Sequence, residues 1–227
     1  AHYASYPDID WDERMEVFLK KFDLIRDPIT TQIDNYENLT DCFDAIKRIN
    51  TVLIDLNRDL WSYISMNYIK QTVVKEEVGS STMPHKVNPI NFENSEGNLM
   101  IANTLLEFMS AKLPISRLQR DLTDSTVVRN IGTIFGHITI AYNSLLSGLD
   151  KLVPNNDYIQ KDLHNNYSVI VEGLQTIMRK HGHKDSYEKF KDLTRTNSVI
   201  TKDTVDSFIN CLDVSHECRE EMKQITL

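Results

Sequence analysis

Glycine and proline are scarce in this chain of 227 residues, with seven and six copies. A β-rich protein with many tight turns needs more of both, because these residues supply the backbone angles of turns. The composition therefore favours helices. Apolar runs of membrane-spanning length and a charged-then-apolar leader are also missing. These absences predict a cytoplasmic protein that does not bind a membrane.

Basic residues are fewer than acidic ones, 25 against 33, which gives a formal charge of −8 and a pI near 5.4. A general nucleic-acid binder needs a basic face, so we expect no nucleic acid as partner. A local cationic pocket remains compatible with this balance. The three cysteines, Cys42, Cys211 and Cys218, are odd in number and lack a metal-like grouping. We expect reduced thiols, no metal and no cofactor.

A long helical pattern dominates the first third of the chain. Apolar residues step by three and four along one stripe between residues 34 and 70, at Leu39, Phe43, Ile46, Ile49, Leu53, Leu56, Leu60 and Ile64. No Gly or Pro interrupts it. A helix of that length measures about 50 Å. Such a rod normally buries its stripe in a bundle or between subunits.

Further helices are expected at 11–24 with Asp10 as its cap, at 89–109, and from 121–124 to 152. Gly132, Gly136 and Gly148 inside the last one indicate close contacts between helices. Residues 153–156 break the chain, and short helices follow at 156–164, 167–181, 185–195, 201–211 and 215–225. No strand alternation stands out. The sequence thus predicts an all-α protein with a central long-helix domain over 1–152 and a C-terminal helical domain over 153–227.

The segment from Gly79 to Pro89, Gly-Ser-Ser-Thr-Met-Pro-His-Lys-Val-Asn-Pro, joins a flexible hydroxyl-rich loop to a helix start. Asn88 suits an N-cap and Pro89 the first helical position. A helix N-terminus next to Lys86 can attract a carboxylate. From the residues alone Ser80, Ser81 and Thr82 are equivalent candidates for a reacting hydroxyl. The plainer interpretation is a polar loop between helices.

Two arginines and a serine form a second constellation. Ser125 and Arg129 are four residues apart at an expected helix start, so they share a face, and Arg120 lies just before them. Two guanidinium forks and a hydroxyl suit a phosphate. The alternative is ordinary surface salt bridging with Asp121 and Asp124.

The segment 79–89 resembles the signature of the fumarase/aspartase superfamily of lyases. Residues 27–33, 91–98 and 116–130 narrow the resemblance to the adenylosuccinate lyase family. The resemblance implies an all-α long-helix bundle followed by a small all-helical domain, in a homotetramer whose active sites are shared between subunits. It covers only the later half to two-thirds of a family subunit. The segment that carries the family's catalytic His is absent, so we expect this chain alone to be inactive.

For the chemistry, the resemblance implies β-elimination of fumarate from adenylosuccinate, leaving AMP, and the same cleavage of the succinyl-carboxamide ribonucleotide of purine synthesis. Ser80 aligns with the base, in a loop over 73–90 that must close to exclude water, and Lys86 and Asn88 would hold the charged carboxylate. The implied substrate contacts are Gln32, Ser81, Met83, Asn94, Arg120, Ser125, Thr126 and Arg129.

Two rival functions remain open at this stage. A sister lyase acting on argininosuccinate, malate or aspartate shares the signature loop, although its substrate lacks the phosphate that the Arg120–Arg129 face would bind. A non-catalytic helical scaffold with the same fold is the other. The intact Ser80, Lys86 and Asn88 count against the scaffold.

Overall fold

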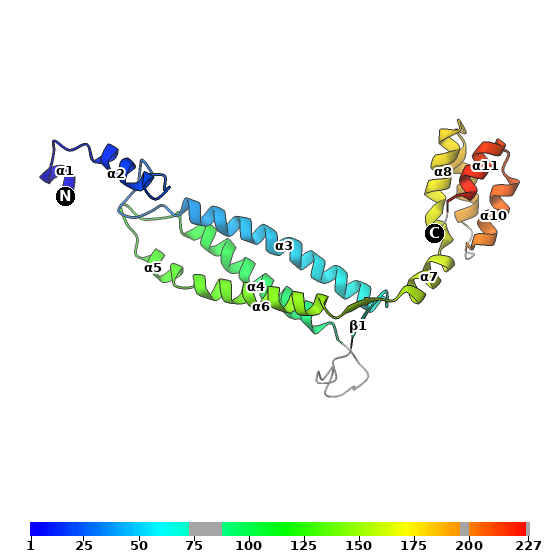
Figure 1. Ribbon diagram of the computed structural model, residues 1–227, viewed down its shortest axis with the longest axis horizontal. Helices are drawn as coiled ribbons and strands as arrows, with labels where there is room; N and C mark the ends of the chain where they lie inside the picture. Colours follow the sequence, from blue (N-terminus) through cyan, green and yellow to red (C-terminus); the bar gives the residue numbers. More distant parts are fainter. Residues whose placement is uncertain (73–87, 196–199, 226–227) are drawn as a thin grey trace. The chain divides into compact units, whose positions relative to one another are not determined.

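The structure, a computed structural model, describes residues 1–72, 88–195 and 200–225. The described chain forms two compact units (Figure 1). The first comprises residues 1–61 and 88–150, and the second comprises the described residues from 62 to 72 and from 151 onward. The long helix α3 (Glu37–Ser65) begins in the first unit and ends in the second.

The first unit is built on an antiparallel bundle of α3, α4 (Ile90–Lys112) and α6 (Ile131–Leu149), seen side by side in Figure 1. The short helices α1 (His2–Ser5), α2 (Trp11–Lys20) and α5 (Thr123–Val128) complete it. Bonds such as Asn57 to Ser95 and Asn50 to Asn103 pair α3 with α4 in opposite directions. The apolar core contains Phe43, Ala102, Leu106, Met109, Leu113, Ile134 and Ile138.

The second unit contains two short strands and a cluster of small helices. Strands β1 (Ile69–Gln71) and β2 (Leu152–Pro154) pair antiparallel, with Ile69 opposite Pro154. The helices are α7 (Asn156–Asn165), the 3₁₀ turn η1 (Tyr167–Ile170), α8 (Val171–Lys180), α9 (Ser186–Thr194), α10 (Lys202–Cys211) and α11 (His216–Lys223). Their core includes Leu174, Met178, Phe190, Val205, Ile209 and Met222.

The all-α prediction is confirmed, and most helices lie where the periodicity places them. Asp10 caps α2 as expected, because its carboxylate accepts from the N–H groups of Asp12 and Glu13. The long helix, however, ends at Ser65 rather than near residue 70. Asn67 has a positive φ of 62°, and the Tyr68 N–H donates to the Tyr63 carbonyl. This is a left-handed helix end, and β1 follows it where no strand was predicted.

The predicted helix from 121–124 to 152 is in fact two helices, α5 and α6. The side-chain amide of Asn130 donates to the carbonyls of Thr126 and Val127 and ends α5. Asn competes with helix backbone bonds in this way. A second correction concerns α4, which begins at Ile90 with Pro89, and not Asn88, as its N-cap residue.

The expected role of glycine is confirmed at one position of three. A Cβ on Gly148 would lie 2.9 Å from the Phe92 ring of α4, so α4 and α6 approach closely there. Gly132 and Gly136 have open space around the position of a Cβ within the described chain. Close packing inside this bundle therefore explains Gly148 alone.

The stripe of α3 divides between the bundle interior and the surface. Phe43 and Leu60 are buried, whereas Ile49 and Leu56 are exposed. Two asparagines share the buried line: Asn50 is 0% exposed and Asn57 is 1% exposed. The Asn50 amide donates to Asn103 Oδ1 at 2.9 Å and accepts from the Tyr142 hydroxyl at 2.8 Å. Polar contacts thus run through the centre of the bundle.

Among the described helices none combines the length and the apolar character that crossing a membrane requires.

Candidate active site

The first group of candidate residues lies at the start of α4. An open hollow of about 490 Å³ is lined by Ile90, Asn91, Glu93, Asn94 and Ser144. Asn88 is half-buried directly before this helix. Of the predicted site residues, Asn94 therefore faces a hollow beside the end of the signature segment. Ser80, Ser81, Met83 and Lys86 lie outside the described residues.

The side chain of Asn94 is held by hydrogen bonds from α4 and α6. Asn98 Nδ2 donates to both the backbone oxygen and Oδ1 of Asn94, at 2.8 and 2.9 Å. Asn94 Nδ2 donates to Ser144 Oγ at 3.2 Å. The exposed amide is thus fixed at the edge of the hollow.

Sequence reasoning did not single out Glu93, which lines the same hollow. Its carboxylate accepts from the indole N–H of Trp61 on α3 at 3.0 Å. An acidic residue in a first helical turn is ordinarily explained by the helix dipole, so the sequence pattern alone gave it no further role. The one feature of the sequence that could have drawn attention to Glu93 is its position directly before the candidate residue Asn94.

The second group lies around α5. The backbone N–H of Gln32 donates to the Gln119 carbonyl at 3.1 Å, which brings Gln32 next to Arg120. A hollow of about 510 Å³ is lined by Arg117, Arg120, Asp121, Leu122, Thr123 and Thr126. Gln32, Arg120, Ser125, Thr126 and Arg129 belong to this end of the first unit, and Ser125 and Thr126 are exposed there. This end therefore collects the predicted anion-binding residues.

The two nearby aspartates bond with other partners. Asp121 pairs with Arg117 at 2.9 Å and accepts from the Thr123 N–H at 2.8 Å. This backbone bond holds the pKa of Asp121 below its ordinary value. Buried Asp124 accepts from the Tyr36 hydroxyl at 2.9 Å, and burial, with this bond, raises the pKa of Tyr36. Neither Arg120 nor Arg129 forms a salt bridge with any residue of the described ranges.

The helix geometry of this group differs from the prediction. Arg129 is the C-cap of α5, a helix of six residues, and does not lie one turn along a continuing helix. The Ser125 hydroxyl donates to the Leu122 carbonyl at 2.9 Å, and Asp121 already occupies the Thr123 N–H. A phosphate would therefore depend on the guanidinium groups more than on the helix N-terminus.

The two groups lie at opposite ends of the bundle. Asp124 bonds to Tyr36, which precedes α3, and the Ser110 hydroxyl near the end of α4 faces the carbonyl of Thr40. Asn94 is at the other end of α4, and the sixteen residue steps from Asn94 to Ser110 span about 24 Å. One small substrate cannot touch both groups of the same chain.

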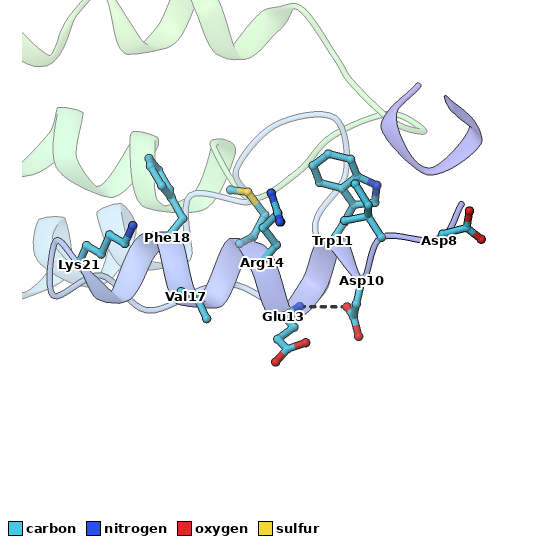
Figure 2. Close-up of a pocket in the computed structure, with 10 residues that line it drawn as sticks. Asp8, Asp10, Trp11, Glu13, Arg14, Val17, Phe18 and Lys21 are labelled. Atoms are coloured by element: carbon cyan, nitrogen blue, oxygen red, sulfur yellow. Dashed lines mark hydrogen bonds between the residues drawn. The ribbon is translucent and has the colours of Figure 1, made fainter. Parts of the chain in front are cut away.

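A third hollow, of about 760 Å³, lies alongside α2 (Figure 2). Figure 2 shows Trp11, Arg14 and Phe18 along it, with the Asp10 carboxylate bonded to the Glu13 N–H. None of the predicted site residues lines it.

A long antiparallel helix bundle followed by a small helical cluster, with polar and cationic groups at the bundle ends, is the architecture of a fumarase/aspartase-type lyase. The family described as "Lyase" accordingly matches residues 7–103. The family described as "Adenylosuccinate lyase C-terminal" matches residues 116–227. The chain belongs to the adenylosuccinate lyase family.

Curated relatives agree with this placement. The adenylosuccinate lyase of Dictyostelium discoideum is 53% identical over 230 residues, which cover 100% of this chain and 49% of the relative. Those of Buchnera aphidicola (from Acyrthosiphon pisum) and Escherichia coli K12 are 48% and 46% identical over 226 residues, with the same shares. The chain spans about half the length of the curated relatives it matches.

Proposed function

We propose that the protein to which this chain belongs is a lyase that cleaves adenylosuccinate to AMP and fumarate, and the succinyl-carboxamide ribonucleotide to its carboxamide product and fumarate. The relatives carry the name adenylosuccinate lyase. The structural observation that carries the proposal is the pair Arg120 and Arg129, which lack carboxylate partners in the described part of the chain although Asp121 and Asp124 are near in sequence. Two such guanidinium groups suit a phosphate dianion.

In the proposed reaction Ser80 is the base. Its oxygen removes a proton from the β-carbon of the succinyl group, and the electron pair is held as an aci-carboxylate by Lys86 and Asn88. The C–N bond then breaks, a C=C bond forms, and a general acid protonates the departing nitrogen. Arg120, Ser125, Thr126 and Arg129 bind the phosphate end. The further contacts are Gln32, Ser81, Met83 and Asn94.

We also propose a homotetramer whose active sites combine residues from several copies. The bundle exposes many large apolar side chains, among them Ile49, Val52, Met100, Ile101, Phe108, Phe135, Ile140 and Leu146. Apolar surface of this extent on one bundle is typical of an interface. The separation of about 24 Å along α4 between the two groups supports the same proposal, because a second copy can bring the opposite end alongside.

The cytoplasm is the compartment that we propose, because the three described thiols are free, as expected in a reducing environment. The long-helix domain over 1–152 would carry the reaction, and the domain over 153–227 would complete the subunit.

The test is fumarate release by the full-length protein, followed by absorbance, with adenylosuccinate, argininosuccinate, malate and aspartate supplied separately. We expect release from adenylosuccinate alone. Release from argininosuccinate, malate or aspartate instead would identify a sister lyase. A protein that assembles but acts on none of the four would support the scaffold.

A further inference from the structure

Both ends of the Asn94 side-chain amide form hydrogen bonds. On one side it accepts from Asn98 Nδ2, which also donates to the Asn94 backbone carbonyl. On the other side it donates to Ser144 Oγ. Contacts at both ends of a planar amide fix its rotation.

The directions of these bonds allow one arrangement only. A backbone carbonyl can only accept, so the nitrogen of Asn98 faces Asn94, and the Asn94 oxygen must accept from that nitrogen. The Ser144 hydroxyl donates its single proton to the Asn91 carbonyl at 2.9 Å. Its oxygen can then only accept from Asn94 Nδ2. The Asn94 amide is oriented from both ends.

His137 on α6 adds one more residue to this series of hydrogen bonds. Its Nδ1 lies 2.8 Å from Asn98 Oδ1. An amide oxygen carries no proton, so Nδ1 is the donor. His137 and Asn98 are both half-buried, whereas Asn94 is exposed at the hollow. The half-buried residues His137 and Asn98 therefore hold the side chain of Asn94, which is exposed to solvent.

We propose that Asn98 and His137 are positioning residues that turn the amide of Asn94 so that its remaining N–H points to a substrate carboxylate. This inference rests on the proposed function. The Asn94 oxygen is engaged by Asn98 and one N–H by Ser144, which leaves the second N–H for a ligand. A bond from an amide N–H to a carboxylate is charge-assisted. An amide turned the other way would present its oxygen and repel the same group.

A double-mutant cycle tests the proposal in the assembled full-length protein. The value of kcat/KM for fumarate release from adenylosuccinate is measured for the parent, Asn94→Ala, Asn98→Ala and the double variant. Removing Asn98 acts through Asn94, so Asn98→Ala should reproduce most of the loss caused by Asn94→Ala, about tenfold. When Asn94 is already alanine, adding Asn98→Ala should lower kcat/KM no further. A merely structural role would add its own loss to that of Asn94→Ala.

Asn103→Ala is the matched control. Asn103 is also on α4 and also joins two helices, because its oxygen accepts from Asn50, but it has no bond to Asn94. We expect this variant to keep kcat/KM within about twofold of the parent, whatever stability it loses.

A second pair of variants keeps the test valid if Asn98→Ala does not assemble. His137→Phe removes the donor to Asn98, whereas His137→Asn retains an N–H near the position of Nδ1. We expect a lower kcat/KM for His137→Phe and recovery of most of it with His137→Asn. Equal losses in the two variants would overturn the positioning role.

The remaining outcomes separate this proposal from the proposed function. If Asn94→Ala impairs fumarate release and Asn98→Ala does not, the positioning role is wrong and the function stands. Additive losses at Asn94 and Asn98 would likewise overturn the positioning role and leave the function in place. A parent that releases no fumarate from adenylosuccinate, or an Asn94→Ala variant equal to the parent, would overturn the substrate site itself and this inference with it.

Discussion

Arg120 and Arg129 form no salt bridge with Asp121 or Asp124, because these two aspartates bond with other residues. Asp121 pairs with Arg117 and accepts from the Thr123 N–H. Asp124 accepts from the Tyr36 hydroxyl through Oδ2, and its buried Oδ1 has no partner among the described residues. Neither carboxylate pairs with Arg120 or Arg129 in the described ranges. The surface salt-bridging alternative is therefore not the arrangement that the described residues adopt.

Replacing Arg129 by Lys keeps the charge but removes the planar fork. We expect the affinity for AMP to fall about tenfold, because Lys cannot make a bidentate contact with a phosphate. The measurement is calorimetric titration of the assembled protein with AMP. Arg117→Lys is the control, since Arg117 is an exposed partner of Asp121 and its ion pair contributes about 0–1 kcal/mol. Equal affinities for the parent and Arg129→Lys would return this segment to an ordinary charged helix start.

Ser80→Ala should abolish fumarate release and leave AMP binding largely intact, because the hydroxyl is required for proton removal more than for ground-state binding. Turnover and AMP titration on the same preparations check this. Ser81→Ala is the comparison, with one hydroxyl removed from the adjoining position; because Ser81 is a proposed substrate contact and not the base, this variant should bind substrate less tightly and still release fumarate. A protein that tolerates Ser80→Ala and is inactivated by Ser81→Ala would assign the base to the second serine.

At the residue level the resemblance named candidate site residues, whose roles stay predictions, and it could not give the hydrogen bonds that these residues make. Gln32, Asn94 and Arg120 were singled out by resemblance. The hydrogen-bond partners of the Asn94 side chain, which are Asn98 and, on another helix, Ser144, are known only from the structure. Buried Asn50 and Asn57 were missed because a polar residue beside an apolar stripe ordinarily faces water. Only packing of three helices shows that their amides are engaged inside.

At the scale of elements, apolar periodicity and capping residues predicted the helices well. The ends of α2 and of α7 to α11 lie within a few residues of expectation. Two of the misplaced helix ends share a cause, which is an asparagine at the end of the helix. Asn67 adopts a left-handed conformation that ends α3, and Asn130 bonds to the carbonyls that end α5. Both effects depend on one residue and leave the hydrophobic pattern unchanged, so periodicity could not predict them.

Gly148→Ala tests the close approach of α4 and α6. Its new Cβ would lie 2.9 Å from the Phe92 ring and 3.0 Å from Asn91 Cβ, so we expect a loss of about 1–3 kcal/mol in the free energy of unfolding. Gly136→Ala on the same helix has open space within the described part of the chain and should gain about 0.5–1 kcal/mol from helix propensity. Denaturant unfolding measures both. A comparable loss at Gly136 would indicate that another copy packs against that face.

At the scale of the whole molecule, the proposed sharing of active sites between copies can be tested by mixing variants. The proposal assigns Ser80 and Arg129 of one site to different copies, so a variant at Ser80 and a variant at Arg129 each damage a different part of that site. Mixed tetramers of Ser80→Ala and Arg129→Ala should therefore contain some sites with both groups intact. We expect fumarate release to reappear when the two inactive variants are dissociated, mixed and reassembled.

The control for this experiment mixes each inactive variant with itself under the same conditions, which should leave it inactive. If the mixed tetramers remain as inactive as these controls, each site would draw Ser80 and Arg129 from a single chain, contrary to the proposed sharing. Sedimentation of the mixtures would verify that reassembly occurred.

Asn50 and Asn57 are seven residues apart on α3, yet their surroundings are unequal. Asn50 donates to Asn103 and accepts from Tyr142, whereas Asn57 donates to Ser95 and its Oδ1 has no partner among the described residues. Sliding α3 by one heptad would place Asn50 opposite Ser95 and Phe43 opposite Asn103 and Tyr142, leaving two polar groups unsatisfied in the interior. Leucine at both positions would tolerate that slide. We therefore expect the two asparagines to select the alignment of α3 during folding, because a bundle shifted by one heptad would satisfy hydrophobic collapse but leave these polar groups without partners.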